Sequence, residues 1–549
     1  MKKILALVLA CSALVVMHSQ DKNNSKGKFD EFRERINKDF NDTKKRNDST
    51  YRAFRDKINA QYAEFLKEIW VEAAPQPAIP EPKEDKPVPP QPYIAPTPEP
   101  VIPAPVEPTP VPDTISVEPV PTVPAPAPKP EPVAPAPKPE PIPEALPAPT
   151  PRLIPFDVVI TAPKPEIQPL PITPIYEIPQ DDTEWFEFTF YGTTCKVRLD
   201  SRHKFTLAST SNDAIAAQWA QFTSELYDNI IRDCLELRIK LNLCDYGYLQ
   251  MLDALASAFL GEDSNEATFL MAYLYCQSGY QMRFAVTTSG KLRMLYSSKH
   301  TIFNTPYYTL NDERFYPYKM GDESCRISPA KFEKEQALSF MLDKSPNFEN
   351  AVDDGRIIQS GRYPDMQVKV AINKNLIDFY NSYPSSEYPG NFMTQWAIYA
   401  NTPLTEDVKK DLYPALKSNL DGVSQFDAVS RLLNFVQTGL EYEYDDVVWG
   451  RERAFFAEES LHYPYCDCED RSILLSRLVR DLVGLDVVLV YYPGHLAAAV
   501  RFTDDIRGDH VVFEGNKYIV CDPTYIGAPI GMTMPGMDNT SAKLIKLER

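Results

Sequence analysis

A proline tract places the strongest constraint on what this chain can fold into. Residues 75–179 hold 38 of its 52 prolines, and the heptapeptide PAPKPEP occurs at 126–132 and again at 135–141. Because proline lacks the backbone N–H that helices and sheets require, such a segment cannot build a hydrogen-bonded core and favours extended polyproline II. We therefore expect residues 74–181 to form a disordered spacer that holds a globular region away from an anchor. A ligand for a proline-recognising partner is the alternative.

Residues 1–20 have the pattern of an export signal. Lys2 and Lys3 form a basic start, residues 4–17 are apolar, and polar residues follow. The apolar stretch is too short for an ordinary membrane span of about twenty residues. The sequence thus predicts an exported protein of the periplasm, the cell envelope or the medium. A lipoprotein attached through Cys11 is an alternative, and the apolar residues after Cys11 count against it.

Residues 21–73 are highly charged and carry apolar residues at helical spacing, which predicts a helical stalk. The segment FDEFRERINKDF (29–40) matches YRAFRDKINAQY (51–62) at an offset of 22 residues. Two 11-residue periods keep an apolar stripe nearly straight along a helix. Such a stripe serves either self-association or docking to a surface, or it packs the helix onto another domain of the same chain.

From residue 181 onward the sequence has the composition of a globular protein. Residues 183–200 alternate like a β-hairpin around Gly192 and Thr193, and helical patterns follow to residue 278. The net charge of −19 argues against nucleic-acid or anionic-membrane partners, which need basic patches. We divide the globular region into a first unit, a connecting α/β subdomain and a C-terminal domain, over residues 182–330, 331–415 and 416–549.

The C-terminal domain carries the residues that point to chemistry. A helical pattern over 469–483 ends at Gly484, which is suited to a C-terminal cap. Strand patterns follow at 486–492, 495–502 and 517–522. Cys468 is therefore expected at the start of a helix, His495 at the start of a strand and Asp522 at the end of another.

Cysteine, histidine and aspartate in this arrangement are typical of nucleophilic catalysis. Only a thiolate attacks a carbonyl group well, and a helix N-terminus together with an imidazolium stabilises that anion. We expect Cys468 to be the nucleophile, His495 to take its proton and Asp522 to orient the imidazole. The backbone N–H of Cys468 is a natural oxyanion donor. Candidates for a second donor are Tyr465, His462 and Trp449.

These residues resemble the motifs of the transglutaminase-like superfamily, which includes bacterial transglutaminase-like cysteine proteinases. The matching stretches are Cys466-Asp467-Cys468-Glu469-Asp470-Arg471-Ser472, then Gly494-His495, then Asp522-Pro523-Thr524. The resemblance implies an α+β, papain-like core and acyl transfer through a cysteine thioester on a protein or peptide substrate. The acceptor would be water, as in a peptidase or amidase, or an amine, as in protein cross-linking.

One residue departs from the family motif, because Cys466 stands where glycine is usual. We favour Cys468 as the nucleophile by its motif position and its place on the buried stripe of the predicted helix. The competing hypothesis is a non-enzymatic binding or scaffolding protein of the cell envelope, with an inactive fold of the same type.

Residues 261–295 follow the pattern of residues 466–499, which predicts a tandem copy without nucleophile and base. Aligning Gly279 with Gly484, and SGKL with PGHL, places Asp263 opposite Cys468 and Lys291 opposite His495. Aligning YYTLND with KYIVCD places Asp312 opposite Asp522. The alternative is two unrelated helix–strand units that align by chance.

Two structural alternatives involve the same cysteines. Cys466 and Cys521 each neighbour a residue of the proposed triad, so a disulfide between them is one alternative. The other is a metal site, but the spacing of the candidate ligands is not that of common zinc sites. We therefore predict neither a metal nor another cofactor. The candidate ligands are His462, Cys466, Cys468, His495 and Cys521.

Overall fold

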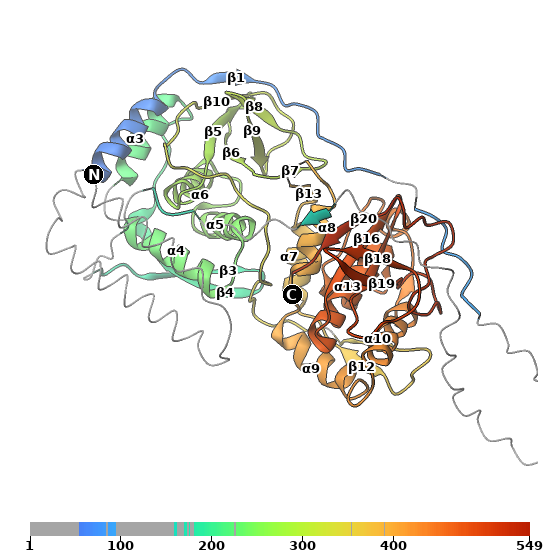
Figure 1. Cartoon of the computed structure of the whole chain (residues 1–549). Coiled ribbons are helices and arrows are strands. Elements are labelled where there is room, and N and C mark those ends of the chain that lie inside the picture. The colour runs from blue at the N-terminus through green and yellow to red at the C-terminus, as the bar shows by residue number, and fades with distance from the viewer. Residues whose placement is uncertain are drawn as a thin grey trace, which may run out of the picture.

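The chain has a mixed α+β fold, as the sequence predicts, and it is described by a computed structural model (Figure 1). The predicted export signal, most of the predicted stalk and most of the proline tract lie outside the described residues. Among the residues that are described, no helix is both long and apolar enough to cross a membrane. The described residues are 54–83, 86–94, 159–161, 169–172, 175, 181–223, 227–352, 354–388 and 390–548.

The first unit opens with the predicted hairpin and continues with helices. Strands β3 (Trp185–Phe190) and β4 (Thr193–Arg198) pair in antiparallel fashion. Serine side chains cap two of the helices that follow, because Ser211 accepts from the N–H of Ala214 and Ser264 from that of Ala267. The helices are α3 (Asn212–Phe222), α4 (Asp228–Lys240), α5 (Asp245–Leu260) and α6 (Asn265–Gln277).

The sheet of the first unit contains six antiparallel strands in the order β1-β10-β5-β6-β9-β8 and curls into a near-closed barrel. Every residue of β5 is buried, because α6 packs on the strand from one side and the curled sheet encloses the other. The strands are β1 (Val71–Ala73), β5 (Met282–Thr287), β6 (Leu292–Ser297), β8 (Tyr308–Leu310), β9 (Glu313–Tyr318) and β10 (Cys325–Ile327).

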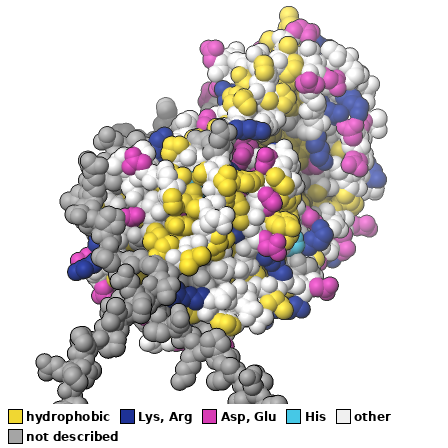
Figure 2. All heavy atoms as spheres, turned by 90° about the vertical axis from the view of Figure 1, so that its right-hand side faces the viewer, with side chains coloured by type: hydrophobic (Ala, Val, Ile, Leu, Met, Phe, Trp, Pro, Cys, Tyr) yellow, Lys and Arg dark blue, Asp and Glu magenta, His cyan; other side chains and the backbone are white. Residues whose placement is uncertain are grey.

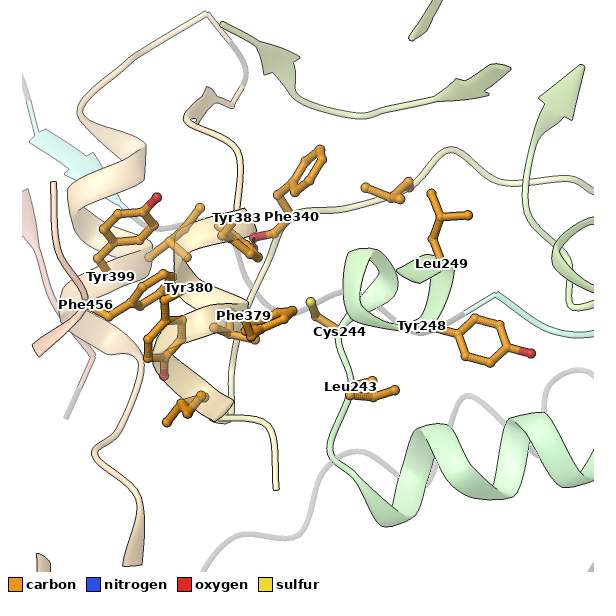
Figure 3. Packing of buried hydrophobic residues seen from close by; sticks show 14 of the residues in the cluster. Leu243, Cys244, Tyr248, Leu249, Phe340, Phe379, Tyr380, Tyr383, Tyr399 and Phe456 are labelled. Carbon is orange, nitrogen blue, oxygen red and sulfur yellow. Dashed lines mark hydrogen bonds between the residues drawn. The ribbon is translucent and has the colours of Figure 1, made fainter. Parts of the chain in front are cut away.

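A connecting region joins the two units through a shared aromatic core. The ring of Phe456 stacks on Tyr380 at 4.2 Å and on Tyr399 at 4.0 Å between centroids. In Figure 3 the ring of Phe379 lies between these rings and Cys244 of the first unit, and all of them belong to one hydrophobic core that the two units share. The connecting elements are β7 (Thr301–Ile302), β11 (Arg356–Gln359), β12 (Gln367–Val370), α7 (Lys374–Ser382), β13 (Ser386–Glu387), α8 (Thr394–Asn401) and α9 (Glu406–Lys417).

The second unit confirms the elements predicted for the C-terminal domain. Helix α10 (Gln425–Gly439) precedes α13 (Cys468–Leu478), which continues as a π-helical turn to Val483 and ends at Gly484 in the left-handed conformation. A curled half-barrel of five strands follows, with the order β18-β19-β17-β16-β20, and β2 (Val159–Thr161) adds to its β20 edge. The strands are β16 (Val487–Tyr492), β17 (His495–Val500), β18 (His510–Phe513), β19 (Asn516–Cys521) and β20 (Lys543–Lys546).

The two large sheets have the same connectivity. Read from the edge strand, the first is β1-β10-β5-β6-β9-β8 and the second is β2-β20-β16-β17-β19-β18, so each strand has a counterpart in chain order. The registers also agree, because Met294 pairs with Tyr318 in the first sheet as Ala498 pairs with Cys521 in the second. The one difference lies at the edge, where β1 is antiparallel to its neighbour and β2 is parallel.

The described end of the predicted stalk packs on the first unit. Residues 54–66 are helical, and the ring of Tyr62 stacks on Phe332 at 4.2 Å between centroids. Arg55 donates to the buried carboxylate of Asp228 at 3.0 Å. This part of the chain therefore follows the alternative in which the helix packs onto another domain.

The described start of the proline tract lies along both units. In Figure 1 it runs in blue from β1 over the molecule to the second unit. Gln76 and Tyr307 exchange backbone hydrogen bonds, and the N–H of Asn304 donates to the carbonyl of Ile79 at 2.8 Å.

On the face of the molecule shown in Figure 2, apolar side chains gather in a central band, with acidic and basic side chains interspersed around it.

Candidate active site

Cys468 is the first residue of α13, and buried hydrogen bonds fix the start of that helix. The N–H of Asp467 donates to Oδ2 of Asp470 at 3.2 Å, which satisfies a backbone donor ahead of the helix. The Oδ1 atom of Asp470 accepts from the N–H of Phe455 at 2.8 Å. The prediction that Cys468 lies at a helix start, on its buried side, is confirmed.

Helix α13 packs on β17, the strand that begins with His495. The hydroxyl of Ser472 donates to the carbonyl of Leu496 at 2.8 Å and so ties the first turn of the helix to the start of the strand. Cys468 and His495 consequently line one pocket. The pocket is lined by Glu81, Pro82, Lys86, Phe303, Phe392, Gln395, Trp396, Glu452, Arg453, Ala454, Cys468, Glu469, Tyr491, Gly494, His495 and Leu496.

His495 and Asp522 form a buried pair. The Nε2 atom of His495 lies 2.9 Å from Oδ2 of Asp522, and both side chains are almost fully buried. The other carboxylate oxygen, Oδ1, accepts from the backbone N–H groups of Thr524 at 2.9 Å and Tyr525 at 3.3 Å. The carboxylate is thus held through both of its oxygens, and it engages Nε2 of the imidazole.

Two buried polar residues, which the sequence analysis missed, hold the loop after Asp522. The amide nitrogen of Gln437 donates to the carbonyls of Asp522 at 3.0 Å and Tyr525 at 2.9 Å. The guanidinium of Arg471 donates to the carbonyl of Pro523 at 3.3 Å and so connects α13 to the same loop. A glutamine on the apolar stripe of the helix at 425–439 is the sequence signal that could have identified Gln437.

The surroundings of Cys468 favour the neutral thiol over the thiolate. Burial raises its pKa well above the ordinary value, the carboxylates of Glu469 and Asp467 raise it further, and the ammonium of Lys86 lowers it. The Sγ atom donates to Oε2 of Glu469 at 3.0 Å. Cys468 is only 3% and His495 only 2% exposed, so both residues are almost fully buried in the pocket.

The pocket contains an amide that the sequence analysis did not identify. Among the described residues that line it, Gln395 of α8 is present and the predicted donors Tyr465, His462 and Trp449 are not. The Oε1 atom of Gln395 accepts from the N–H of Ser386 at 3.1 Å. Because a backbone N–H can only donate, this contact identifies the oxygen branch and leaves the NH₂ branch as a donor.

The two cysteines of the motif lie in different surroundings. Cys466 and Cys521 are both free thiols, so the disulfide between them is not formed. Cys466 donates to the carbonyl of Glu441 at 3.7 Å, away from the pocket-lining residues, and burial raises its pKa to about 11. This placement favours Cys468 as the thiol that can meet a substrate.

Potential metal ligands cluster differently from the set that the sequence offered. Within the described part of the chain, the clustered ligand atoms belong to carboxylates and to Sγ of Cys468, and neither histidine of the predicted set joins them. The ammonium of Lys86 lies among these carboxylates and offsets part of their charge. The clusters are drawn from Asp445, Glu452, Asp467, Cys468, Glu469 and Asp470.

In the first unit, an ion pair occupies the place of the thiol and imidazole. Asp263, just before α6, pairs with Lys291, just before β6, and with Arg293 at 2.7 Å. Met294 and Ala498 occupy equivalent positions in the two sheets. Lys291 lies three residues before Met294, and His495 lies three residues before Ala498, so the predicted match of Lys291 with His495 agrees with the strand pairing. An alignment from the glycine at the helix end places Asp263 opposite Cys468, whereas an alignment from the helix start places Asn265 there. The two differ because the π-helical turn makes the helix of the second unit longer than α6.

The predicted match of Asp312 with Asp522 is wrong. Asp312 lies in the turn between β8 and β9 with a positive φ of 63°, whereas Asp522 follows the end of β19. Since β9 is the counterpart of β19, the residue opposite Asp522 is Lys319, which pairs with Asp253 at 2.5 Å. The first unit therefore carries lysines opposite both the histidine and the aspartate.

Comparisons with models of protein families, with curated proteins and with solved structures found no match. The function of this chain is therefore inferred from its motif residues and from the geometry of the pocket.

Proposed function

We propose that the chain is a thiol enzyme of the transglutaminase-like type, which transfers acyl groups through a thioester on Cys468. The observation that carries the proposal is the pocket in which a cysteine at a helix start and a histidine paired with a buried aspartate both contribute lining atoms. The position of Cys468 at a helix start, of His495 at a strand start and of Asp522 after a strand end supports the proposal, because these residues follow the order of the motifs that resemble that family.

The chemistry depends on the roles that these atoms can take. Since Nε2 of His495 faces Asp522, Nδ1 is the nitrogen that accepts the thiol proton. The sulfur then bonds to the substrate carbonyl carbon, and the proton passes from Nδ1 to the departing amine. An acceptor next loses its proton to Nδ1 and displaces the sulfur, which restores the thiol.

The oxyanion that forms in both steps requires donors. The backbone N–H of Cys468, at the first position of α13, is one. The NH₂ group of Gln395 is the second in our proposal, in place of the three residues that the sequence offered. Two donors in a buried pocket stabilise the transition state more than they would in water, because the local dielectric is low.

The matched sheets support a duplication in which only the second copy kept the reactive residues. The shared strand order and register favour this over two unrelated units. An aspartate–lysine pair cannot form a thioester, so the first copy would serve as a scaffold or as part of the substrate cleft. Both copies would then have the papain-like core that the resemblance implies.

The substrate class in this proposal is a protein or peptide outside the cytoplasm, with water as the preferred acceptor because it is always present. A small activated ester, p-nitrophenyl acetate, tests the first half-reaction without knowledge of the substrate. We expect a burst of nitrophenolate and an acetyl group on Cys468, both abolished in Cys468→Ala and His495→Ala. Adding a primary amine then separates hydrolysis from amine transfer by the product formed.

The second candidate function, a binding or scaffolding protein, is favoured by the low exposure of Cys468 and the raised pKa of its thiol. The same experiment separates the two candidates. If acetylation is slow and spreads evenly over the eight free cysteines of the described residues, with no effect of His495→Ala, the scaffold is the better description.

A further inference from the structure

A short segment of the proline tract covers the pocket. We call it the strap and define it as residues 81–83 and 86–94. At one end, the N–H of Glu81 donates to the side chain of Asn304 at 3.4 Å, and Oε1 of Glu81 accepts from the hydroxyl of Ser385. Glu81, Pro82 and Lys86 all line the pocket that holds Cys468.

The other end of the strap is fixed to the loop that follows Asp522. The N–H of Tyr93 donates to the carbonyl of Ile526 at 2.9 Å, and its ring meets that of Tyr525 edge-on at 6.3 Å. The backbone of the strap lies so close to this loop that a Cβ atom on Gly527 would come within 2.9 Å of the carbonyl oxygen of Tyr93. Between the two ends, the hydroxyl of Tyr444 donates to the carbonyl of Pro87 at 3.3 Å.

Lys86 fastens the middle of the strap beside the thiol. Its ammonium, whose side chain is only 12% exposed, lies 2.9 Å from Glu469 and 2.9 Å from Glu452 and also pairs with Asp467. Asp467 and Glu469 flank Cys468 in the sequence, and Lys86 and Cys468 line the same pocket, so the ammonium lies near the residue that would attack a substrate. The second carboxylate oxygen of Glu469, Oε2, accepts from the thiol of Cys468 at 3.0 Å.

These contacts have a steric and a chemical consequence. The strap fills one side of the pocket, and Cys468 and His495 are almost fully buried beneath the covering elements. A peptide carbonyl needs a nucleophile within about 3.5 Å and a clear line of attack. The strap therefore narrows the approach of an acyl donor as large as a peptide to Cys468.

We propose that the strap is a built-in inhibitory cover of the Cys468 pocket, latched by Lys86, which must leave before a substrate can enter. The inference rests on the proposed function, since it assigns the covered thiol a substrate. The anchoring contacts described above lie at its two ends and at Lys86 and Pro87, so the strap can open locally without unfolding of the two units.

The experiment measures access to Cys468 separately from its ionisation. Full-length protein is alkylated with iodoacetamide and, in parallel, with the much larger N-(1-pyrenyl)maleimide, and peptide mass spectrometry gives the rate at Cys468. The ratio of the two rates at one pH does not depend on the thiolate fraction, because both reagents consume the same thiolate. Lys86→Ala removes the latch, and Gly527→Ala pushes the strap away while leaving Lys86 in place.

Matched controls are available for both variants. Lys83→Ala removes an exposed lysine of the same strap, and Gly515→Ala places a side chain at another glycine with positive φ where the surrounding space is open. We expect the ratio of large-reagent to small-reagent rates to rise about tenfold or more in Lys86→Ala and Gly527→Ala, as local opening becomes frequent. In Lys83→Ala and Gly515→Ala it stays at the wild-type value.

If the ratio of large-reagent to small-reagent rates is unchanged in both test variants, the proposal that the strap is an inhibitory cover is wrong. A change of both rates by one factor in Lys86→Ala, with no change in Gly527→Ala, would show that Lys86 only tunes the charge of the thiol, and it would overturn the strap as well. Failure of the proposed function looks different. In that case Cys468 would become accessible in the test variants, but its acetylation rate would be the same with His495 as in His495→Ala.

Discussion

Asp522→Asn tests how the imidazole is oriented, and the structure determines what the substitution does. The backbone N–H groups of Thr524 and Tyr525 both donate to Oδ1, so the asparagine must keep its oxygen at that position. Its NH₂ group then faces Nε2 of His495, where the carboxylate oxygen lay at 2.9 Å. A ring nitrogen that faces a donor has to accept, and the proton of the neutral imidazole moves to Nδ1.

The size of the effect is set by this change of tautomer. With Nδ1 protonated, the neutral ring can no longer accept the proton of Cys468, and the imidazolium loses its bond to a charged acceptor. A hydrogen bond to a charged group contributes about 1.5–3 kcal/mol, which corresponds to a loss of about 10- to 150-fold in the acylation rate. The free energy of unfolding changes by less than about 2 kcal/mol, because the backbone contacts to the loop remain.

The assay is the burst of nitrophenolate at neutral pH, measured in a Lys86→Ala background so that the pocket is open. Asp504→Asn is the control, since it makes the same change at an exposed carboxylate of the second unit. Asp522→Asn should lose the burst rate and Asp504→Asn should keep it. An undiminished burst in Asp522→Asn, from protein in which His495→Ala abolishes it, would refute the reasoning about the tautomer.

Three further predictions concern the donor, a buried acid and the N-terminal helix. Gln395→Glu keeps the acceptor for Ser386 and removes the NH₂ donor, so the ratio of the acetylation rate to the alkylation rate at Cys468 should fall about 100-fold or more, because both reactions consume the same thiolate and only acetylation forms an oxyanion. Burial raises the pKa of Glu458 from 4.5 to about 7, so the contribution of the protonated carboxyl to stability is complete below pH 4.5 and is lost as the pH rises through 7. In urea unfolding, the free energy of unfolding of Glu458→Gln should therefore gain up to about 3 kcal/mol relative to wild type between pH 5 and pH 9, and an equal difference at the two pH values would contradict this. Tyr62→Ala should cost about 3–5 kcal/mol in thermal unfolding because its stacked ring is buried, whereas the exposed Phe65→Ala should stay within about 0.5 kcal/mol; similar losses in both would show that the helix does not pack as described.

The elements that carry the site could be predicted because their patterns are local. The helix over 469–483, its glycine cap and the three strands after it all appear where apolar periodicity placed them. The positions of Cys468, His495 and Asp522 are then fixed by the ends of these elements. Strong periodicity in a buried helix and buried strands leaves little freedom in such an assignment.

The rest of the pocket comes from segments distant in the sequence, which no local pattern connects. Gln395 lies in another subdomain, and Lys86 comes from a proline tract that has neither helical nor strand periodicity. The composition of this tract predicts a spacer, and its described start instead packs against both units. The alignment of Asp312 failed for a related reason, because sequence similarity matched β8 to β19, whereas strand pairing makes β9 the counterpart.

The central claim is that the sulfur of Cys468 and the imidazole of His495 act on one group, and a bifunctional reagent tests it most directly. 1,3-Dibromoacetone alkylates a thiol and then a second nucleophile within reach of its three-carbon bridge. In Lys86→Ala protein we predict a cross-link that joins the peptides containing residues 468 and 495, as seen by mass spectrometry. Cys468 alkylated once with its second arm hydrolysed, or bridged to a residue other than His495, would contradict this claim.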